Sequence, residues 1–301
     1  MDPGIFYSVL AAVGWGVYIF VLKLYFSDYS GAQIAVAVNA FAILWYAPVT
    51  ATRLDPAAVP SLATLGVTGL ATIATTIVAI GLGFVLFIYA LDGGDVSYVA
   101  PINKLVPVFV LPIEIVLLSA HLTVLQLGGV AVATMAVYVA NYEGGGLFEP
   151  LRRAATSRPA QFALASAACY AAGDVGKRVG LQELAIPTTL WVPILFVGGA
   201  LVLFPLAVRN WRPVRGDLPK FAAAGLLVAG SEHVTSVAFS LVPASIGSPI
   251  INTQAVVAVI LGGVVLRESQ FGTRLVAAVL AVAGVTLIAV GDVGALVSMV
   301  R

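Results

Sequence analysis

The sequence predicts an all-α polytopic membrane protein, with ten transmembrane helices arranged as two inverted five-helix repeats. Three observations support this prediction: an unusually apolar composition, ten long apolar windows, and an internal repeat. Of the 301 residues, 60% are hydrophobic and only 10% are charged, and the mean hydropathy is +1.05. Ordinary soluble domains contain roughly 45–50% apolar residues. The net charge of +1 gives no reason to expect a nucleic-acid partner.

Ten windows are long enough to span a bilayer, which requires about 20 mostly apolar residues. They cover residues 4–26, 31–52, 61–91, 95–118, 123–142, 159–180, 187–209, 218–241, 244–266 and 271–291. Gly-rich turns separate several of them, as at Asp92-Gly93-Gly94-Asp95. The first window follows Asp2 rather than a basic leader, so we interpret it as a retained span and not as a signal peptide.

The two halves of the sequence resemble each other. Lys23 aligns with Arg178 at an offset of 155 residues, and Pro101 aligns with Pro249 at an offset of 148. We expect the first half's surplus, about seven residues, in its long third window. The predicted repeats are residues 1–142 and 159–301, joined by a linker at 143–158. Because each half holds an odd number of spans, the repeats are expected to be inverted, as in many secondary transporters.

Three segments resemble a known family in their order and spacing. They are Leu10-Ala11-Ala12-Val13-Gly14-Trp15-Gly16, Tyr89-Ala90-Leu91 with Asp95-Val96-Ser97-Tyr98-Val99-Ala100-Pro101-Ile102, and Leu266-Arg267-Glu268. The chain is similar over nearly its whole length to the drug/metabolite transporter superfamily, EamA type. The resemblance implies an alternating-access carrier of small metabolites, often an exporter. The departures are Ser119-Ala120-His121, where the family usually has a Glu, and Lys104 in the fourth window.

Glu232 and His233 form the sharpest candidate site. They lie near the middle of the eighth window, where a charge is costly and normally faces a bundle interior or a water-filled cavity. A carboxylate there is able to bind a substrate ammonium, to carry a coupling proton, or both. The alternative is a protonated Glu bonded to a neighbouring helix, with His233 packed against a hydroxyl. Adjacent helical residues point about 100° apart, so we do not expect both to face a ligand squarely.

Lys104, preceded by Asn103, is the candidate counter-ion for a substrate carboxylate or other anionic group. The alternative role is an internal salt bridge, for example to Glu232. The repeat counterpart of Lys104 is Asn252, which lies close to Gln254. Polar side chains at equivalent depth on two crossing helices predict a shared binding cavity, although such residues also bond adjacent helices.

Asp174, Lys177 and Arg178 have the spacing of ion pairs within one helix. We therefore expect Asp174 to neutralise one of the two cations, which leaves Lys104 and Glu232 as the charges without such a local partner. Asp174 also remains a candidate for proton coupling.

Two aromatic residues, Trp15 and Tyr170, are repeat equivalents about halfway along their helices. They are candidates either for the wall of a substrate cavity or for core packing. Trp45, Trp191 and Trp211 lie nearer the window ends, where anchoring at the membrane interface is expected.

These observations predict a secondary transporter, most simply an exporter, of a small polar or amphipathic metabolite such as an amino acid. Lys104 would hold its carboxylate, and Glu232 its ammonium or a coupling proton. Proton-coupled efflux of cationic or aromatic drugs is the alternative. A membrane-embedded enzyme is a distant third, because the only histidines, His121 and His233, show no metal-ligand spacing.

The environment and partners follow from the same reasoning. We expect a multi-pass protein of the cell (inner or plasma) membrane, either a monomer or a homodimer, that needs no metal or cofactor. Its partners are the lipid bilayer and a small-molecule substrate. Lys and Arg gather on the side reached after the first span, so the positive-inside rule predicts both termini outside.

Overall fold

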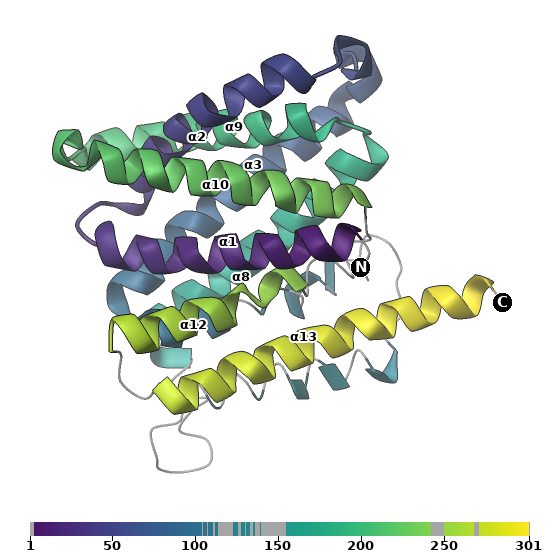
Figure 1. Ribbon diagram of the computed structural model, residues 1–301. Helices are drawn as coiled ribbons and strands as arrows, with labels where there is room; N and C mark the ends of the chain where they lie inside the picture. The colour runs from purple at the N-terminus through teal and green to yellow at the C-terminus, as the bar shows by residue number, and fades with distance from the viewer. Residues whose placement is uncertain are drawn as a thin grey trace.

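The regular structure of the described chain is entirely helical (Figure 1). The computed structural model describes residues 3–103, 155–241, 250–267 and 271–300, together with short runs and single positions between 105 and 139. The first half contains α1 (Pro3–Tyr25), α2 (Gly31–Arg53), α3 (Leu62–Gly93) and α4 (Val96–Asn103). The second contains α8 (Arg158–Arg178), α9 (Thr188–Ala207), α10 (Leu218–Leu241), α12 (Gln254–Val265) and α13 (Phe271–Val300). Short turns are η1 (Pro56–Ala58), η2 (Val179–Glu183), η3 (Val208–Asn210) and η4 (Arg215–Asp217).

Most of the apolar windows correspond to helices within a few residues. Serine residues set three of the starts, because each side chain accepts a hydrogen bond from a backbone N–H of the first turn. Ser30 caps α2, Ser61 caps α3 and Ser157 caps α8. The predicted windows 95–118, 123–142 and 244–266 are described only in part.

Five of the described helices are long and apolar enough to cross a membrane, judged by length and composition. They are Pro3–Tyr25, Gly31–Arg53, Leu62–Gly93, Thr188–Asn210 and Arg215–Leu241. Two shorter apolar helices, Ile250–Val265 and Phe271–Gly284, follow. Helix α8 is not in this set, and it carries Asp174, Lys177 and Arg178 near its end.

The helices of the two halves pack in a reciprocal pattern. Helix α1 lies against α10 and α12, while α8, its repeat counterpart, lies against α3 and α4. Helix α2 packs along its own counterpart α9, and α4 along α12. Figure 1 shows α1 running beside α10, with α2 and α9 in the layer beyond. Each of these contacts is therefore reproduced when the two halves are exchanged.

The same exchange holds for individual residues at two helix crossings. A Cβ added to Gly14 of α1 would overlap Ser231 of α10. A Cβ added to Gly83 of α3 would lie 3.2 Å from the Cβ of Cys169 in α8. At the offsets of 155 and 148, Gly14 corresponds to Cys169 and Gly83 to Ser231. One glycine thus serves each close crossing, as small residues do between packed membrane helices.

Helix α3 is longer than its counterpart, with 32 residues against 24 in α10. This agrees with the surplus expected in the third window. The additional turns include Gly66, whose φ of 59° interrupts the helix, so that α3 consists of two segments joined at a kink. A left-handed residue of this kind is favourable only for glycine.

Trp191 does not anchor the protein at the membrane interface, and that prediction is wrong. Its side chain is 0% exposed and packs in the core beside Leu195 and Phe239. A Cβ on Gly180 would overlap its ring, so the turn that follows α8 covers it. Trp45, by contrast, is 48% exposed.

One end of the bundle is closed by aromatic and polar contacts between two connections. The rings of Phe26 and Phe221 lie 4.6 Å apart, and Tyr29 packs edge-on against Phe221 at 5.2 Å. The Tyr29 hydroxyl donates to Asp217 Oδ2 at 2.6 Å. Gln33 bonds the backbone of Arg212 twice, donating to its O at 2.6 Å and accepting from its N at 3.1 Å. These contacts tie the α1–α2 connection to the segment that precedes α10.

Candidate functional site

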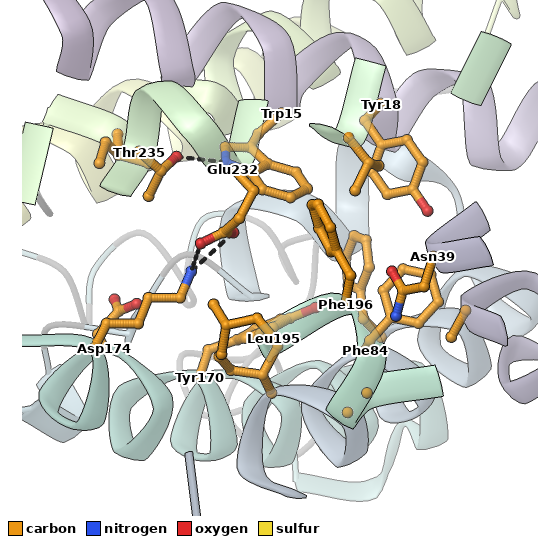
Figure 2. A pocket seen from close by; sticks show the side chains of 18 of the residues that line it. Trp15, Tyr18, Asn39, Phe84, Tyr170, Asp174, Leu195, Phe196, Glu232 and Thr235 are labelled. Atoms are coloured by element: carbon orange, nitrogen blue, oxygen red, sulfur yellow. Dashed lines mark hydrogen bonds and ion pairs between the residues drawn. The ribbon is translucent and has the colours of Figure 1, made fainter. Parts of the chain in front are cut away.

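A cavity of about 180 Å³ lies among helices of both halves (Figure 2). Its wall is formed by side chains of α1, α2, α3, α8, α9, α10 and the start of α12. Aromatic rings make up much of it: Trp15, Tyr18, Phe84, Phe87, Tyr170, Phe196 and Phe239. The polar members are Asn39, Asp174, Lys177, Glu232, Thr235, Asn252 and Gln254. Mostly apolar walls with a few placed polar groups are typical of small-molecule sites.

A buried ion pair occupies one side of this cavity. Lys177 Nζ lies 2.7 Å from Glu232 Oε1 and 2.9 Å from Oε2. The two side chains are only 9% and 7% exposed. Burial of two charges is tolerated because each neutralises the other, and removing either partner alone typically costs about 3–5 kcal/mol.

Hydrogen bonds fix the helix that carries Glu232. Ser236 Oγ, one turn further along α10, donates to Glu232 Oε1 at 3.4 Å. Trp15 Nε1 of α1 donates to Thr235 Oγ1 at 2.9 Å, and that hydroxyl donates in turn to the backbone of Ser231 at 2.7 Å. The indole is therefore held in the cavity wall with its polar edge satisfied.

The position of Lys177 follows from the local structure of α8. Gly176 lets this helix approach α3 closely, since a Cβ there would overlap Thr76. Just after Arg178 the chain forms a five-residue π-helical turn, η2. Such turns are rare and occur frequently at functional sites. Close packing before the turn and irregular backbone after it place the Lys177 ammonium against α10.

The sequence predicted that Asp174 neutralises one of the two cations of α8, Lys177 or Arg178. The Lys177 ammonium contacts Glu232 of another helix, a pairing that the spacing within α8 did not indicate. Glu232 therefore has a close cationic partner that its own helix does not supply. Asp174 lines the same cavity.

Six predicted site residues lie together in the cavity wall: Trp15, Tyr170, Asp174, Glu232, Asn252 and Gln254. Asn252 and Gln254 are almost completely buried, at 5% and 6% exposure. They come from the segment around Thr253, where the backbone turns before α12 begins. The sequence thus identified side chains from four separate helices as one group.

Two other predicted residues do not line the cavity. His233 Nδ1 forms a 2.7 Å hydrogen bond with the hydroxyl of Tyr46 in α2. Asn103 is fully buried, where its amide donates to Ser166 Oγ at 2.8 Å. Both contacts link neighbouring helices. The sequence analysis gave these as the alternative roles: packing against a hydroxyl for His233, and bonding of adjacent helices for the polar amide. Lys104 lies outside the described residues.

The cavity also includes residues that the sequence analysis did not single out, among them Tyr18, Asn39, Phe84 and Phe196. Tyr18 was detectable, because it follows Trp15 by three residues and so shares its helix face. Asn39 was detectable as a single amide in an apolar window. Phe84 and Phe196 carried no comparable signal, since aromatic residues in such windows usually pack in the core or face lipid.

The EamA-like transporter family matches residues 2–142 and again residues 158–290. A protein of known crystal structure is similar over 94% of each chain, with a TM-score of 0.66 and 12% sequence identity, a likeness that concerns the fold. No curated relative matches the chain. The cavity lies between helices of the two matched regions, and the chain belongs to the EamA-like transporter family of multi-pass membrane proteins.

Proposed function

We propose that this transporter carries a small amphipathic zwitterion, such as an amino acid, and that it is an exporter. The observation that carries the proposal is the buried Lys177–Glu232 pair in the wall of a largely aromatic cavity. A zwitterion offers one group of each sign. Its carboxylate replaces Glu232 beside Lys177, while its ammonium takes the place of Lys177 beside Glu232.

The exchange keeps every buried charge neutralised. A ligand with a single charge would satisfy one side chain and leave the other buried without a partner, at a cost of several kcal/mol. A zwitterion avoids this penalty at both ends. Lys104, predicted from the sequence as the carboxylate-binding cation, remains part of the proposal as a second anion-binding group.

The proposed mechanism is alternating access between two inverted repeats, residues 1–142 and 159–301, joined by 143–158. The reciprocal packing of α1 on α10 and of α8 on α3 supports it. With five spans in each half, an odd number, the second half would enter the membrane from the opposite side to the first. In this arrangement the cavity lies between two equivalent helix pairs, whose relative movement exposes it to one side and then to the other.

Proton coupling is part of the proposal, with Glu232 and Asp174 as the carriers. Protonation of Glu232 would remove the negative charge that holds the substrate ammonium. A proton and the substrate would thus compete for Glu232, which is a direct form of coupling and the one that proton-driven export requires. We place the protein in the cell (inner or plasma) membrane, with both termini outside.

Efflux of cationic or aromatic drugs is the second candidate function. The aromatic wall formed by Trp15, Tyr18 and Phe84 favours it, since aromatic rings bind organic cations. The two candidates differ in what they require of Lys177. An exported cation gains nothing from a buried ammonium, whereas a zwitterion needs it for its carboxylate.

The test is uptake of radiolabelled amino acids into proteoliposomes that contain the purified protein, with and without a pH gradient. We expect counterflow of at least one apolar amino acid, and its loss in Lys177→Met. The matched control is Lys220→Met, which removes an exposed lysine of α10 that pairs with Asp217 outside the cavity. Unchanged amino-acid transport by Lys177→Met, or transport of tetraphenylphosphonium alone, would overturn the zwitterion proposal in favour of the drug exporter.

A further inference from the structure

The cavity has a charged wall and an apolar wall that correspond to each other in the internal repeat. At the offset of 155, Lys177 corresponds to Leu22 of the first half. At the offset of 148, Glu232 corresponds to Phe84. All four side chains line the cavity. The two glycine crossings described above obey the same offsets, which supports this register. The apolar counterparts of the ion pair therefore break the symmetry of the cavity and give a ligand one preferred orientation.

Two polar side chains nevertheless stand in the apolar wall, Tyr18 of α1 and Asn39 of α2. Each lies about two helical turns from the short connection between these helices, so the two residues sit at a similar level. Figure 2 shows both on the side of the cavity away from Glu232.

Both groups lack a partner in the part of the chain that the structure describes. Neither the Tyr18 hydroxyl nor the Asn39 side-chain amide forms a hydrogen bond there. Tyr18 is only 5% exposed. Asn39 is half-buried, and because both residues line the cavity, hydrogen-bonding partners for their polar groups must come from what fills it. A bound molecule with its own donor or acceptor would supply the missing bonds.

An apolar section separates these groups from the ion pair. Ser231, the neighbour of Glu232, lies against Gly14, and Tyr18 is one further turn along α1, about 6 Å of rise. Aromatic rings fill this interval: Phe84 stacks on Tyr18 with centroids 6.3 Å apart, and Trp15 lies edge-on at 5.9 Å. A ligand that reaches both ends must have an apolar middle.

We propose that Tyr18 and Asn39 form a second, neutral binding subsite that recognises a hydrogen-bonding group at the far end of the substrate. This inference rests on the proposed function, and it specifies the substrate class. The zwitterionic head lies at Lys177 and Glu232, the apolar body lies along Phe84, and a distal hydroxyl, amide or ring N–H bonds the subsite. Phenol and amide each donate and accept, so the subsite selects for hydrogen bonding without selecting for charge.

The test uses matched substrates that differ by one hydroxyl: phenylalanine with tyrosine, and norleucine with its terminal hydroxyl derivative. Initial uptake rates into proteoliposomes give kcat/KM for each probe. We expect the wild-type protein to favour the hydroxylated member of each pair by about tenfold or more, as sites built to bond a hydroxyl do. The variant Tyr18→Phe/Asn39→Leu should lower kcat/KM for the hydroxylated probes more than for the apolar ones, and so reduce the preference to within about twofold.

Tyr7→Phe is the control, because it removes the same hydroxyl from the same helix outside the cavity. It should retain the preference. Equal wild-type kcat/KM values within each pair would overturn the subsite and leave the proposed function intact. A decrease in kcat/KM in the double variant that is the same for all four probes would have the same meaning. If the wild-type protein carries none of the four, the amino-acid function itself fails, and the subsite fails with it.

Discussion

Lys177 and Glu232 lie 55 residues apart in the sequence, and their contact of 2.7 Å joins α8 to α10. Helix α8 packs along α3, and α10 packs along α1. The ion pair therefore links two helix pairs that face each other across the cavity. A substrate or proton that separates the two charges acts directly on the contact between these pairs. Binding and conformational change are coupled through the same atoms, which is what alternating access requires.

The first prediction concerns the stability of this pair. Lys177→Met or Glu232→Gln alone should lower stability by about 3–5 kcal/mol, because each leaves a buried charge unpaired. The double variant should recover most of the loss, since both charges are then absent. Thermal melting of the purified protein in detergent measures all three variants. Additive losses in the double variant would show that the two side chains act independently.

The second prediction concerns the crossing of α1 and α10. Gly14→Cys should destabilise the protein by about 1–3 kcal/mol, because the added side chain overlaps Ser231. Gly14→Cys/Ser231→Gly should restore stability, since it reproduces the Cys169–Gly83 arrangement of the other crossing. Melting temperatures decide the matter. A double variant no more stable than the single one would mean that the crossings are not equivalent.

Much of the fold was predictable, because a membrane span is recognised in the sequence as a long, continuous run of apolar residues. The expected window 218–241 coincides with α10, and 31–52 differs from α2 by one residue at its end. The depth of a residue in the membrane follows from its position within its apolar window. For this reason Glu232 and Trp15 were correctly expected at the cavity. Rotation about the helix axis is read less well, and His233 accordingly faces Tyr46 rather than the cavity.

The partners of the charged residues were not predictable in the same way. Intrahelical spacing places Asp174 beside Lys177, and a sequence contains no equally direct record of distances between helices. The contact with Glu232 depends on how closely α8 approaches its neighbours, which small residues such as Gly176 permit. Trp191 was misjudged for a related reason, because the η2 turn that covers it is irregular and has no hydrophobic period.

The third prediction separates His233 from its neighbour Glu232. His233→Phe and Tyr46→Phe each remove one side of a hydrogen bond between α10 and α2, so each should lower stability by about 1–3 kcal/mol. Their effects should overlap in the double variant. Substrate KM should stay within about twofold of the wild-type value, since His233 does not line the cavity. A KM increase as large as that of Glu232→Gln would place the imidazole in the binding site.

The fourth prediction concerns pH and the closed end of the bundle. The hydrogen bond to the Asp217 carboxylate raises the pKa of Tyr29 above its ordinary value of 10.0, with burial as a further cause. The folded protein thus holds the phenolic proton more tightly than the unfolded chain does. The stabilisation is complete below about pH 10, and it is lost as the pH rises from there towards the folded-state pKa.

Tyr29→Phe removes this contribution, so the difference in stability between wild type and variant should be constant near neutral pH and should shrink in alkali. Chemical denaturation of the two proteins at a series of pH values measures that difference, and other tyrosines cancel in the comparison. Asp217→Asn should change the pH dependence in the same direction, because it removes the carboxylate that accepts the hydrogen bond from the Tyr29 hydroxyl. A difference that grows above pH 10 would contradict the assigned bond.

The variants Tyr29→Phe and Asp217→Asn should also favour opening at this end of the bundle, since Tyr29 and Asp217 join the connections that close it. A cysteine introduced at Leu22, on the cavity side of Phe26, should then react faster with a membrane-impermeant maleimide once Cys169 has been replaced by Ala.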